Sequence, residues 1–396
     1  MVAERTDIAI IGGGLAGGLI ALALARWRPD LRVMVFERGA ALGGNHVWSF
    51  FATDLTPDGE ALIAPLIDAT WSGYDVHFPD YKRTLMTPYR ATTSHRLDAA
   101  VRGALPGGAV VTGVHVAQAT ATTVVLDDGR AYPAGAVIDA RGAGDFASLT
   151  GGWQKFVGQR LKLARPHGLQ RPIVMDATVD QADGYRFVYC LPFARDEVFV
   201  EDTYYSEDAS LDRDALAVRI ADYARAKGWD VLGVMAEEQG VLPVVAGGDF
   251  DRLRGQSGLA LAGTRAGLFH PLTSYSLPDA LRFALALVHW PGLGTGNLPD
   301  FATNYARRHW HAAWYYRKLS AMLFAAAKPR DRYRVLQRFY RLDPGLIERF
   351  YAGRSSAMDK LRILSGRPPV PIGAALGVLT GLGSQPRPLN SEILQR

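Results

Sequence analysis

Cysteine is nearly absent from this chain of 396 residues, which contains Cys190 alone. A single thiol excludes an internal disulfide framework and a cysteine-based zinc site, and we expect no metal site. Acidic residues become scarce toward the carboxyl end: residues 301–396 hold 17 Lys and Arg against 5 Asp and Glu, whereas residues 1–300 carry a net charge of −7. This asymmetry indicates an anionic partner for the basic part of the chain.

Long apolar runs are also rare. Residues 8–25 form a run of 18 residues without a charge, but five of them are glycine, and Glu4 and Asp7 precede the run without a small-residue cleavage site. We therefore expect a buried strand, turn and helix there, and neither a membrane span nor a signal peptide. With 48% hydrophobic and 21% charged residues, the chain is too apolar to be disordered and long enough for two or three domains.

A nucleotide-binding pattern fills this apolar run. A strand, a glycine-rich turn, a helix and a second strand are expected over residues 7–11, 12–18, 19–26 and 32–36. Gly12 would make the tight turn, Gly14 would let backbone amides approach a pyrophosphate, and Gly17 would let helix pack on strand. The helix amino terminus offers N–H groups to the anion, and Glu37 can accept hydrogen bonds from a ribose. These features predict a dinucleotide site.

The remaining chain alternates between strands and helices. Apolar alternation predicts strands at residues 109–116, 122–126, 130–132, 136–142, 185–191, 197–204 and 259–262, and helices at 211–227, 278–288 and within 301–365. Strands 185–191 and 197–204 read as a hairpin, and the apolar face of helix 211–227 consists of Leu216, Ile220 and Tyr223. The last thirty residues, rich in Pro and Gly, are expected to be loosely held.

Five segments in this order resemble the bacterial lycopene β-cyclases, a family of FAD-dependent carotenoid cyclases. They are the glycine turn with Glu37, GGNHVWSF at 43–50, DARG at 139–142, FVEDT at 199–203 and HPLTSYSLP at 270–278. The resemblance implies an α/β fold in which a Rossmann-like FAD-binding domain accompanies an antiparallel-sheet substrate domain and a helical carboxyl-terminal region. The expected divisions are 1–50, 88–150 and 240–300 for FAD, 51–87 and 151–239 for substrate, and 301–396 for the basic aromatic helices.

The resemblance also implies an activity. Such enzymes close both linear ends of lycopene to β-rings, through γ-carotene to β-carotene, as isomerases that need reduced FAD, with NAD(P)H as reductant, and show no net redox change. The FAD contacts that it implies are Gly12, Gly14, Gly17, Glu37, Arg141, Gly142, Gly263, Gly267, Pro271 and Thr273. The catalytic residues that it implies are Glu201, Asp202, His46 and Tyr275, and Trp48 is a further candidate for shaping the cavity.

Cyclisation by protonation needs a carboxylic acid that stays neutral near pH 7, which burial in an apolar pocket achieves by raising the pKa. Strand alternation places Glu201 and Asp202 on opposite faces, so only one of them can face the pocket. We choose Glu201, because the matching position of the family is the one implicated in catalysis. As an alternative, both are solvated strand residues.

Two positions depart from the family pattern. Ser274 stands where the family has glycine, beside Tyr275, so that a side chain there narrows the pocket or changes the turn. Asp202 stands where the plant relatives have glutamate, which keeps the charge and shortens its reach.

The basic carboxyl-terminal part predicts membrane contact. Residues 307–341 contain ten Lys and Arg and one acid, interleaved with Trp, Tyr and Phe. This pattern is typical of a helix on an anionic bilayer, and we expect a cytoplasmic protein that is peripheral on the inner membrane. As an alternative, the same helix packs its apolar face on the protein. Nucleic acid is not expected as a partner, since no nucleic-acid motif accompanies the charges, and the oligomeric state is left open.

Two other functions remain open. A flavin monooxygenase or prenyl-chain reductase would share the fold, although Arg141-Gly142 and Gly263-Thr264 stand where monooxygenases commonly have Asp-Gly and Gly-Asp. A non-catalytic, FAD-dependent carotenoid- or membrane-binding protein would have no use for a buried acid. An exposed Glu201 would favour that second function.

Overall fold

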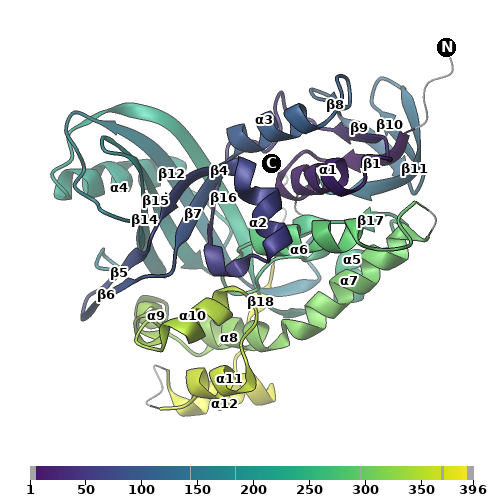
Figure 1. Ribbon diagram of the computed structural model, residues 1–396. Helices are drawn as coiled ribbons and strands as arrows, with labels where there is room; N and C mark the ends of the chain where they lie inside the picture. Colours follow the sequence, from purple (N-terminus) through teal and green to yellow (C-terminus); the bar gives the residue numbers. More distant parts are fainter. Residues whose placement is uncertain (1–5, 143, 183, 295, 367–369, 390–396) are drawn as a thin grey trace.

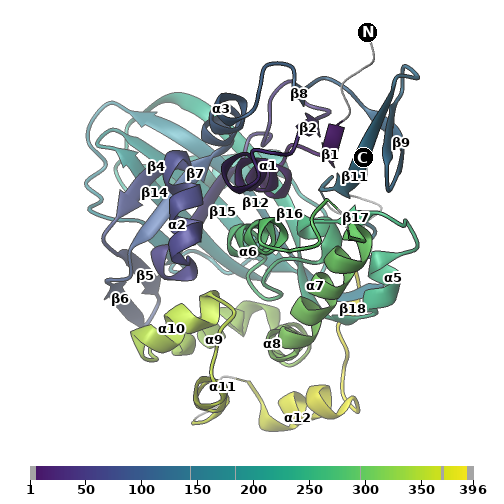
Figure 2. The same cartoon turned by 45° about the vertical axis from the view of Figure 1, so that its right-hand side comes forward.

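The computed structural model describes residues 6–142, 144–182, 184–294, 296–366 and 370–389 (Figure 1). Within these residues the strands form sheets of seven, eight and three strands. The carboxyl-terminal helices lie together at one end of the molecule, below the two larger sheets in Figures 1 and 2. This mixed architecture confirms the predicted α/β class.

The seven-stranded sheet contains the glycine turn. Its order is β8-β2-β1-β11-β10-β9, and β17 pairs with β11. The strands of this sheet are β1 (Thr6–Ile11), β2 (Val33–Phe36), β8 (Val110–Val111), β9 (Val116–Thr120), β10 (Thr123–Leu126), β11 (Ala131–Asp139) and β17 (Ala260–Leu261). Because β1, β2, β11 and β17 run parallel, their carboxyl ends meet at one edge. Ligands of open α/β sheets bind at such an edge.

Three helices pack beside that sheet, and α1 contacts the other two. They are α1 (Leu15–Trp27), α3 (Ser94–Ala104) and α6 (Leu277–Val288). Nearly every residue of α1 from Leu15 to Leu24 is buried, which explains why the run of residues 8–25 is apolar throughout. The run is a buried strand and helix, as predicted.

The eight-stranded sheet contains Glu201. Its order is β16-β12-β15-β14-β13-β5-β6, and β18 pairs with β12. The strands of this sheet are β5 (Tyr74–Phe78), β6 (Tyr81–Leu85), β12 (Leu149–Leu163), β13 (Ile173–Asp176), β14 (Tyr185–Ala194), β15 (Glu197–Ser206), β16 (Val231–Gly248) and β18 (Arg387–Pro388). Helix α4 (Arg213–Ala226) covers one face through buried Leu216, Ile220 and Tyr223, as its periodicity predicts (Figure 1).

The opposite face of this sheet is aromatic and packs against the carboxyl-terminal helices. Those helices are α8 (Trp314–Ala325), α9 (Arg332–Phe339), α10 (Pro344–Tyr351) and α11 (Ala357–Leu364). Helix α7 (Leu298–Ala312) packs beside β17, and α12 (Ile372–Thr380) packs on α8. The third sheet, β3-β7-β4, and helix α2 complete the described elements near this face. Their bounds are β3 (Val47–Phe51), α2 (Pro57–Ile63), β4 (Ile67–Trp71) and β7 (Tyr89–Thr93).

Three expectations about elements are corrected by the structure. Residues 109–116 are not one strand: β8 pairs with β2, whereas β9 starts at Val116 and pairs with β10, because the two segments serve different neighbours. The antiparallel strand expected at 130–132 and the parallel strand at 136–142 are the single strand β11. Residues 387–389 of the carboxyl-terminal segment are held more firmly than expected, since β18 pairs with β12 and Leu389 is buried.

The predicted division into domains stays a prediction. Strand β16 runs from Val231 to Gly248 and continues through the expected boundary at residue 240. No helix within the described ranges is long and apolar enough to span a membrane.

Candidate active site

The glycine turn between β1 and α1 has the geometry that a bound pyrophosphate needs. Gly12 has φ +94°, and a Cβ on Gly17 would lie 1.9 Å from the Gly12 carbonyl oxygen, so neither position tolerates a side chain. A Cβ on Gly14 would meet no atom within 4 Å, which marks open space. The first turn of α1 has no side-chain cap and no acidic residue. Its amides therefore remain available to an anion.

Glu37 follows β2 at the same edge. Its carboxylate accepts hydrogen bonds from the Gly13 and Gly39 amides, at 2.7 Å each. These bonds fix the carboxylate beside the turn, and its oxygens keep further acceptor capacity for ribose hydroxyls.

The segments after β11 and β17 bring two more predicted groups to this edge. Arg141 is turned back onto Asp139, with Nη2 2.8 Å from Oδ2, and Gly142 follows it. Gly263 begins the 3₁₀ helix η3 (Gly263–Ala266) with φ +61°, and a Cβ there would lie 2.6 Å from Ala16 Cβ. Gly267 ends the same helix in a left-handed conformation. Close approach of this turn to α1 thus requires glycine at 263.

The loop from 268 to 276 carries Pro271, Thr273 and Tyr275. It is tied to β16: the Val245 amide donates to the Pro271 carbonyl at 2.8 Å. The Thr273 hydroxyl oxygen is buried and has no protein hydrogen-bond partner within the described residues. Such an orphaned polar atom calls for a ligand or water partner.

Ser274 shows how this chain accommodates its departure from glycine. It is the one non-glycine residue of the described part with positive φ, at 57°. Its hydroxyl donates to the Pro243 carbonyl of β16 at 2.8 Å, which offsets the backbone strain. The turn is therefore kept, and the serine side chain is directed to β16.

His270, in the same loop, is buried. Burial lowers the pKa of its imidazole to about 4, so the ring is neutral near pH 7. Its Nδ1 accepts from the Leu272 and Thr273 amides, both at 3.3 Å. The histidine thereby holds the backbone of the loop.

These features fit a dinucleotide such as FAD. The cofactor would find partners in four features of the site. They are the uncapped amino terminus of α1, the open space at Gly14, the carboxylate of Glu37 and the unpaired hydroxyl of Thr273. Among the described residues no group of three or more His, Cys, Asp or Glu side chains is arranged to hold a metal ion.

Glu201 lies on the aromatic face of the eight-stranded sheet. Its cross-strand partners are Tyr189 on β14 and Gly158 on β12. The residue keeps a small exposed surface, while protein atoms enclose its carboxyl group, and this desolvation raises the pKa to about 8. The Thr203 hydroxyl donates to Oε1 at 2.5 Å. A carboxyl with this pKa is mostly protonated at pH 7.

Asp202 faces the other way, as strand alternation predicts. Its carboxylate is fully buried on the α4 side and pairs with Arg186 through bonds of 2.9 and 2.8 Å. Burial raises its pKa, and the guanidinium opposes that rise. Asp202 was placed among the catalytic residues by resemblance, but the body of the sheet separates it from the face that holds Glu201.

A second carboxylate on the Glu201 face was not foreseen from sequence. Glu238 on β16 is buried, accepts a 2.7 Å hydrogen bond from the Val47 amide, and lies 3.6 Å from Nδ1 of His46. The imidazole of His46 and the indole of Trp48 are neighbours, with ring centroids 5.8 Å apart. The sequence alone does not show whether Glu237 or Glu238 lies on this face, because both are glutamates. The pairing register of β12 with β16 shows that it is Glu238.

Tyr275 is linked to the same face. Its hydroxyl lies 3.0 Å from that of Tyr89, which accepts from Tyr189 at 2.9 Å, and Tyr189 is the strand partner of Glu201. Tyr275 is therefore linked through two hydroxyls to the strand partner of Glu201, whereas His46 lies beside Glu238.

The predicted membrane segment, residues 307–341, is packed against the protein instead of lying free. Most of its aromatic side chains are buried, and Arg317 is buried over the ring of Trp310. Arg332 is 1% exposed and donates to backbone carbonyls. The packing alternative is thus correct for these side chains, and Trp314 is the exposed exception at 54%.

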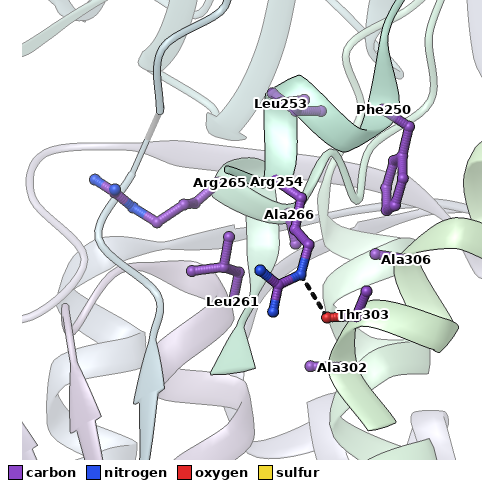
Figure 3. A pocket seen from close by; sticks show the side chains of 9 residues that line it. All are labelled: Phe250, Leu253, Arg254, Leu261, Arg265, Ala266, Ala302, Thr303 and Ala306. Atoms are coloured by element: carbon purple, nitrogen blue, oxygen red, sulfur yellow. Dashed lines mark hydrogen bonds between the residues drawn. The ribbon is translucent and has the colours of Figure 1, made fainter. Parts of the chain in front are cut away.

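Two small cavities lie away from Glu201, Glu238 and the glycine turn. The one in Figure 3 is lined mainly by apolar side chains of α5 (Phe250–Arg254), β17, η3 and α7, and Arg254 donates to Thr303 at 2.7 Å. A second cavity touches Gly267 and Pro271 from the side of Trp310 and Arg317. The first contains none of the predicted cofactor residues and is not assigned to the flavin.

Comparison with known proteins identifies relatives over nearly the whole chain. The model of the lycopene cyclase protein family matches residues 7–376. The lycopene beta-cyclase of Pseudescherichia vulneris is 45% identical over 370 residues, covering 93% of this chain and 96% of that protein. The lycopene beta-cyclase of Pantoea ananas is 43% identical over 370 residues, covering 93% and 97%.

Solved structures share the fold at low sequence identity. A geranylgeranyl bacteriochlorophyll reductase-like protein from Thermoplasma acidophilum matches with TM-score 0.61 and 13% identity, covering 96% of this chain and 99% of that chain. A probable FAD-dependent monooxygenase from Pseudomonas aeruginosa matches with TM-score 0.57 and 16% identity, covering 85% and 100%. The chain thus shares its overall fold with these two proteins.

Proposed function

The chain belongs to the lycopene cyclase family, and on that premise we propose that it closes the linear ends of lycopene to β-rings, through γ-carotene to β-carotene. The observation that carries the mechanism is the enclosed carboxyl of Glu201, with its pKa raised to about 8, on a face made of aromatic side chains. The enzyme is an isomerase, because substrate and product have the same atoms.

The reaction needs a proton at a carbon that is a weak base. Protonating a terminal double bond creates a tertiary cation, the neighbouring double bond attacks it to close the ring, and loss of a ring proton restores neutrality. Glu201 is the proposed donor, since its raised pKa keeps a proton on the carboxyl at pH 7 and the residue is only partly buried. Desolvation in the pocket also protects the cation from water.

The aromatic side chains around Glu201 suit a cationic intermediate. Tyr189 pairs with Glu201 across the strands, and the hydroxyl chain through Tyr89 to Tyr275 fixes the orientation of the three rings. Ring faces attract cations. We assign His46 and Trp48 to the wall of the cavity beside β16.

Gly12, Gly14, Gly17 and Glu37 would hold the FAD pyrophosphate and ribose, and the segments that start at Arg141, Gly263 and Pro271 would line the rest of the cofactor. When bound and reduced, with NAD(P)H as the source of electrons, the flavin supplies negative charge that stabilises a nearby cation. This chain's own residues then provide the proton and the water-free face.

Contact with an anionic membrane is proposed because lycopene is a hydrocarbon. We place it on α11 and α12, which lie together at the end of the molecule in Figures 1 and 2. The large exposed apolar side chains of these helices and of the turn after α12 are Met358, Leu361, Leu364, Leu376 and Leu382, with exposed fractions of 51–90%. Arg362 is exposed on α11, and each basic side chain near the surface adds about 1 kcal/mol. The proposed location is the cytoplasmic side of the inner membrane.

Vesicle binding tests this surface. Leu361→Glu with Leu376→Glu should reduce sedimentation with phosphatidylglycerol vesicles, and phosphatidylcholine vesicles should bind all variants weakly. Leu232→Glu with Met235→Glu is the control, since these side chains are 67% and 55% exposed on β16. Loss of binding in the control alone would place the contact on β16 instead.

The activity itself is tested with the FAD-loaded protein and lycopene. We expect β-carotene to form with reduced FAD, with one deuterium incorporated per ring in D₂O and no stoichiometric NAD(P)H oxidation. One NAD(P)H consumed per product would identify a monooxygenase or reductase on the same fold. Absence of any cyclised product in the reduced enzyme would refute the proposal.

A further inference from the structure

Glu201 and Glu238 stand on either side of a glycine. In the sheet, Gly158 of β12 is the partner of Glu201 on β15 and also of Glu238 on β16. Residues in register on neighbouring strands project to the same face. Both carboxyl groups therefore project from the aromatic face, and the residue between them has no side chain.

The space above Gly158 is shaped by one ring. A Cβ on Gly158 would lie 2.2 Å from Phe199 Cζ, so glycine is required for this ring to lie between the strands. Phe199 is 2% exposed and excludes water from the gap. The field of one carboxylate consequently reaches the other through an apolar medium.

The two carboxyl groups differ in the donors that they meet. Glu238 is 4% exposed and accepts a backbone hydrogen bond from Val47 at 2.7 Å, with His46 at 3.6 Å. Backbone N–H donors favour the ionised form of a carboxyl. Glu201 accepts from the Thr203 hydroxyl, a neutral group on its own strand. The donors that would stabilise a negative charge on the pair are therefore gathered at Glu238.

We propose that Glu238 is a positioning residue whose ionised carboxylate, held by the Val47 amide and His46, keeps Glu201 protonated across Gly158 so that the pair carries one proton. This inference rests on the proposed function and explains why its acid, Glu201, stays protonated and neutral. A like charge disfavours ionisation of a neighbouring carboxyl group, and its effect is stronger across an apolar gap than across water.

The titratable groups around Glu201 agree with this assignment. Burial is the main cause of its raised pKa, and the charge of Glu238 is the next. Asp202 is also negative, but it lies behind the sheet and is paired with Arg186. Tyr189 faces Glu201 from β14, and Arg160 on β12 is paired with Glu197. Glu238 is thus the anion that faces Glu201 without an intervening guanidinium.

The pH profile of cyclisation tests the inference. Glu238→Gln removes the negative charge and keeps the size, so the alkaline limb should move to lower pH by about one unit, with the rate at pH 8 about fivefold lower and the rate at pH 6 near wild type. Glu238→Asp keeps the charge and should restore most of the wild-type profile.

Glu237→Gln is the matched control. Glu237 is the neighbouring acid on β16, and its carboxylate binds Gln159 and Arg213 instead. Its substitution should leave the alkaline limb unchanged. An alkaline limb in Glu238→Gln equal to that of wild type, while Glu201→Gln is inactive, would overturn the positioning role alone. Activity in Glu201→Gln would overturn the proposed function instead.

Infrared spectra of the wild-type holoenzyme give a test that needs no folded Glu238 variant. The wild type minus Glu201→Gln difference spectrum at pH 7 should show the carbonyl stretch of one protonated carboxyl. Absence of this band would show that Glu238 does not keep Glu201 protonated.

Discussion

The two faces of the eight-stranded sheet give adjacent carboxyl groups different partners, although burial raises the pKa of both. On the aromatic face Glu201 meets a threonine hydroxyl and a second acid, and its pKa rises to about 8. On the α4 face Asp202 is more deeply buried, yet Arg186 binds both of its oxygens. Burial alone therefore does not make an acid catalyst. The buried carboxyl group must also lack a compensating cation if it is to stay protonated.

This contrast assigns different work to the two faces. The α4 face contains a compact apolar cluster around a satisfied ion pair, which holds the sheet in shape. The other face carries tyrosine hydroxyls, Glu201 and the contacts to the loops expected at the flavin. One face stabilises the fold, and the other provides the chemistry.

The largest predicted effect comes from breaking the ion pair. Arg186→Met leaves Asp202 buried without its cation, and loss of one partner of a buried pair costs about 3–5 kcal/mol. Urea denaturation should show this decrease in the free energy of unfolding. Adding Asp202→Leu to the same protein should recover most of it, because no charge is then buried. A single variant as stable as wild type would show that the pair contributes nothing.

A smaller effect is expected at the glycine between the two acids. Gly158→Ala forces Phe199 to move, since the new methyl carbon would lie 2.2 Å from Cζ, and overpacking of this kind costs about 1–3 kcal/mol. Thermal unfolding with bound FAD measures the change. Gly103→Ala in α3 is the control: its Cβ meets nothing within 4 Å, and it should stabilise by about 0.5–1 kcal/mol.

The most gradual predicted effect is a pH dependence of stability. The folded-state pKa of Glu201, about 8, exceeds its ordinary value of 4.5, so the folded state binds the extra proton between these pH values. This contribution is complete below about pH 4.5 and is lost as pH rises to 8, by up to about 1.4 kcal/mol per pH unit. Wild type should therefore lose stability relative to Glu201→Gln over that window. Parallel curves would contradict the raised pKa.

The sequence predicts the elements whose signals are local. The glycine turn, the alternation that separates Glu201 from Asp202, and the buried stripe of α4 depend only on nearby residues. Glu238 could not be distinguished from Glu237, because its role depends on pairing with β12, which lies about eighty residues earlier in the chain.

Burial at long range was equally hidden from the sequence. The aromatic residues of 307–341 have the composition of a membrane helix, and only their docking on the sheet reveals them as core. Likewise, the Pro- and Gly-rich end was expected to be loose because the pairing of β18 with β12 has no local signature. Ser274 adopts a backbone conformation typical of glycine, and its hydroxyl donates a hydrogen bond to β16 that could not be predicted from the sequence.

On the proposed mechanism the proton comes from the Glu201 face alone, and one comparison of rates tests this source of the proton directly. Initial rates of ring formation, normalised to bound FAD, are measured for Glu201→Gln and for the double variant Arg186→Met with Asp202→Leu. Glu201→Gln should be at least about 10²-fold slower than wild type, since it has no proton to donate. The double variant should stay within about threefold of wild type, because it removes charge only from the α4 face. Rates near wild type in Glu201→Gln, or an equal loss in both proteins, would contradict the claim.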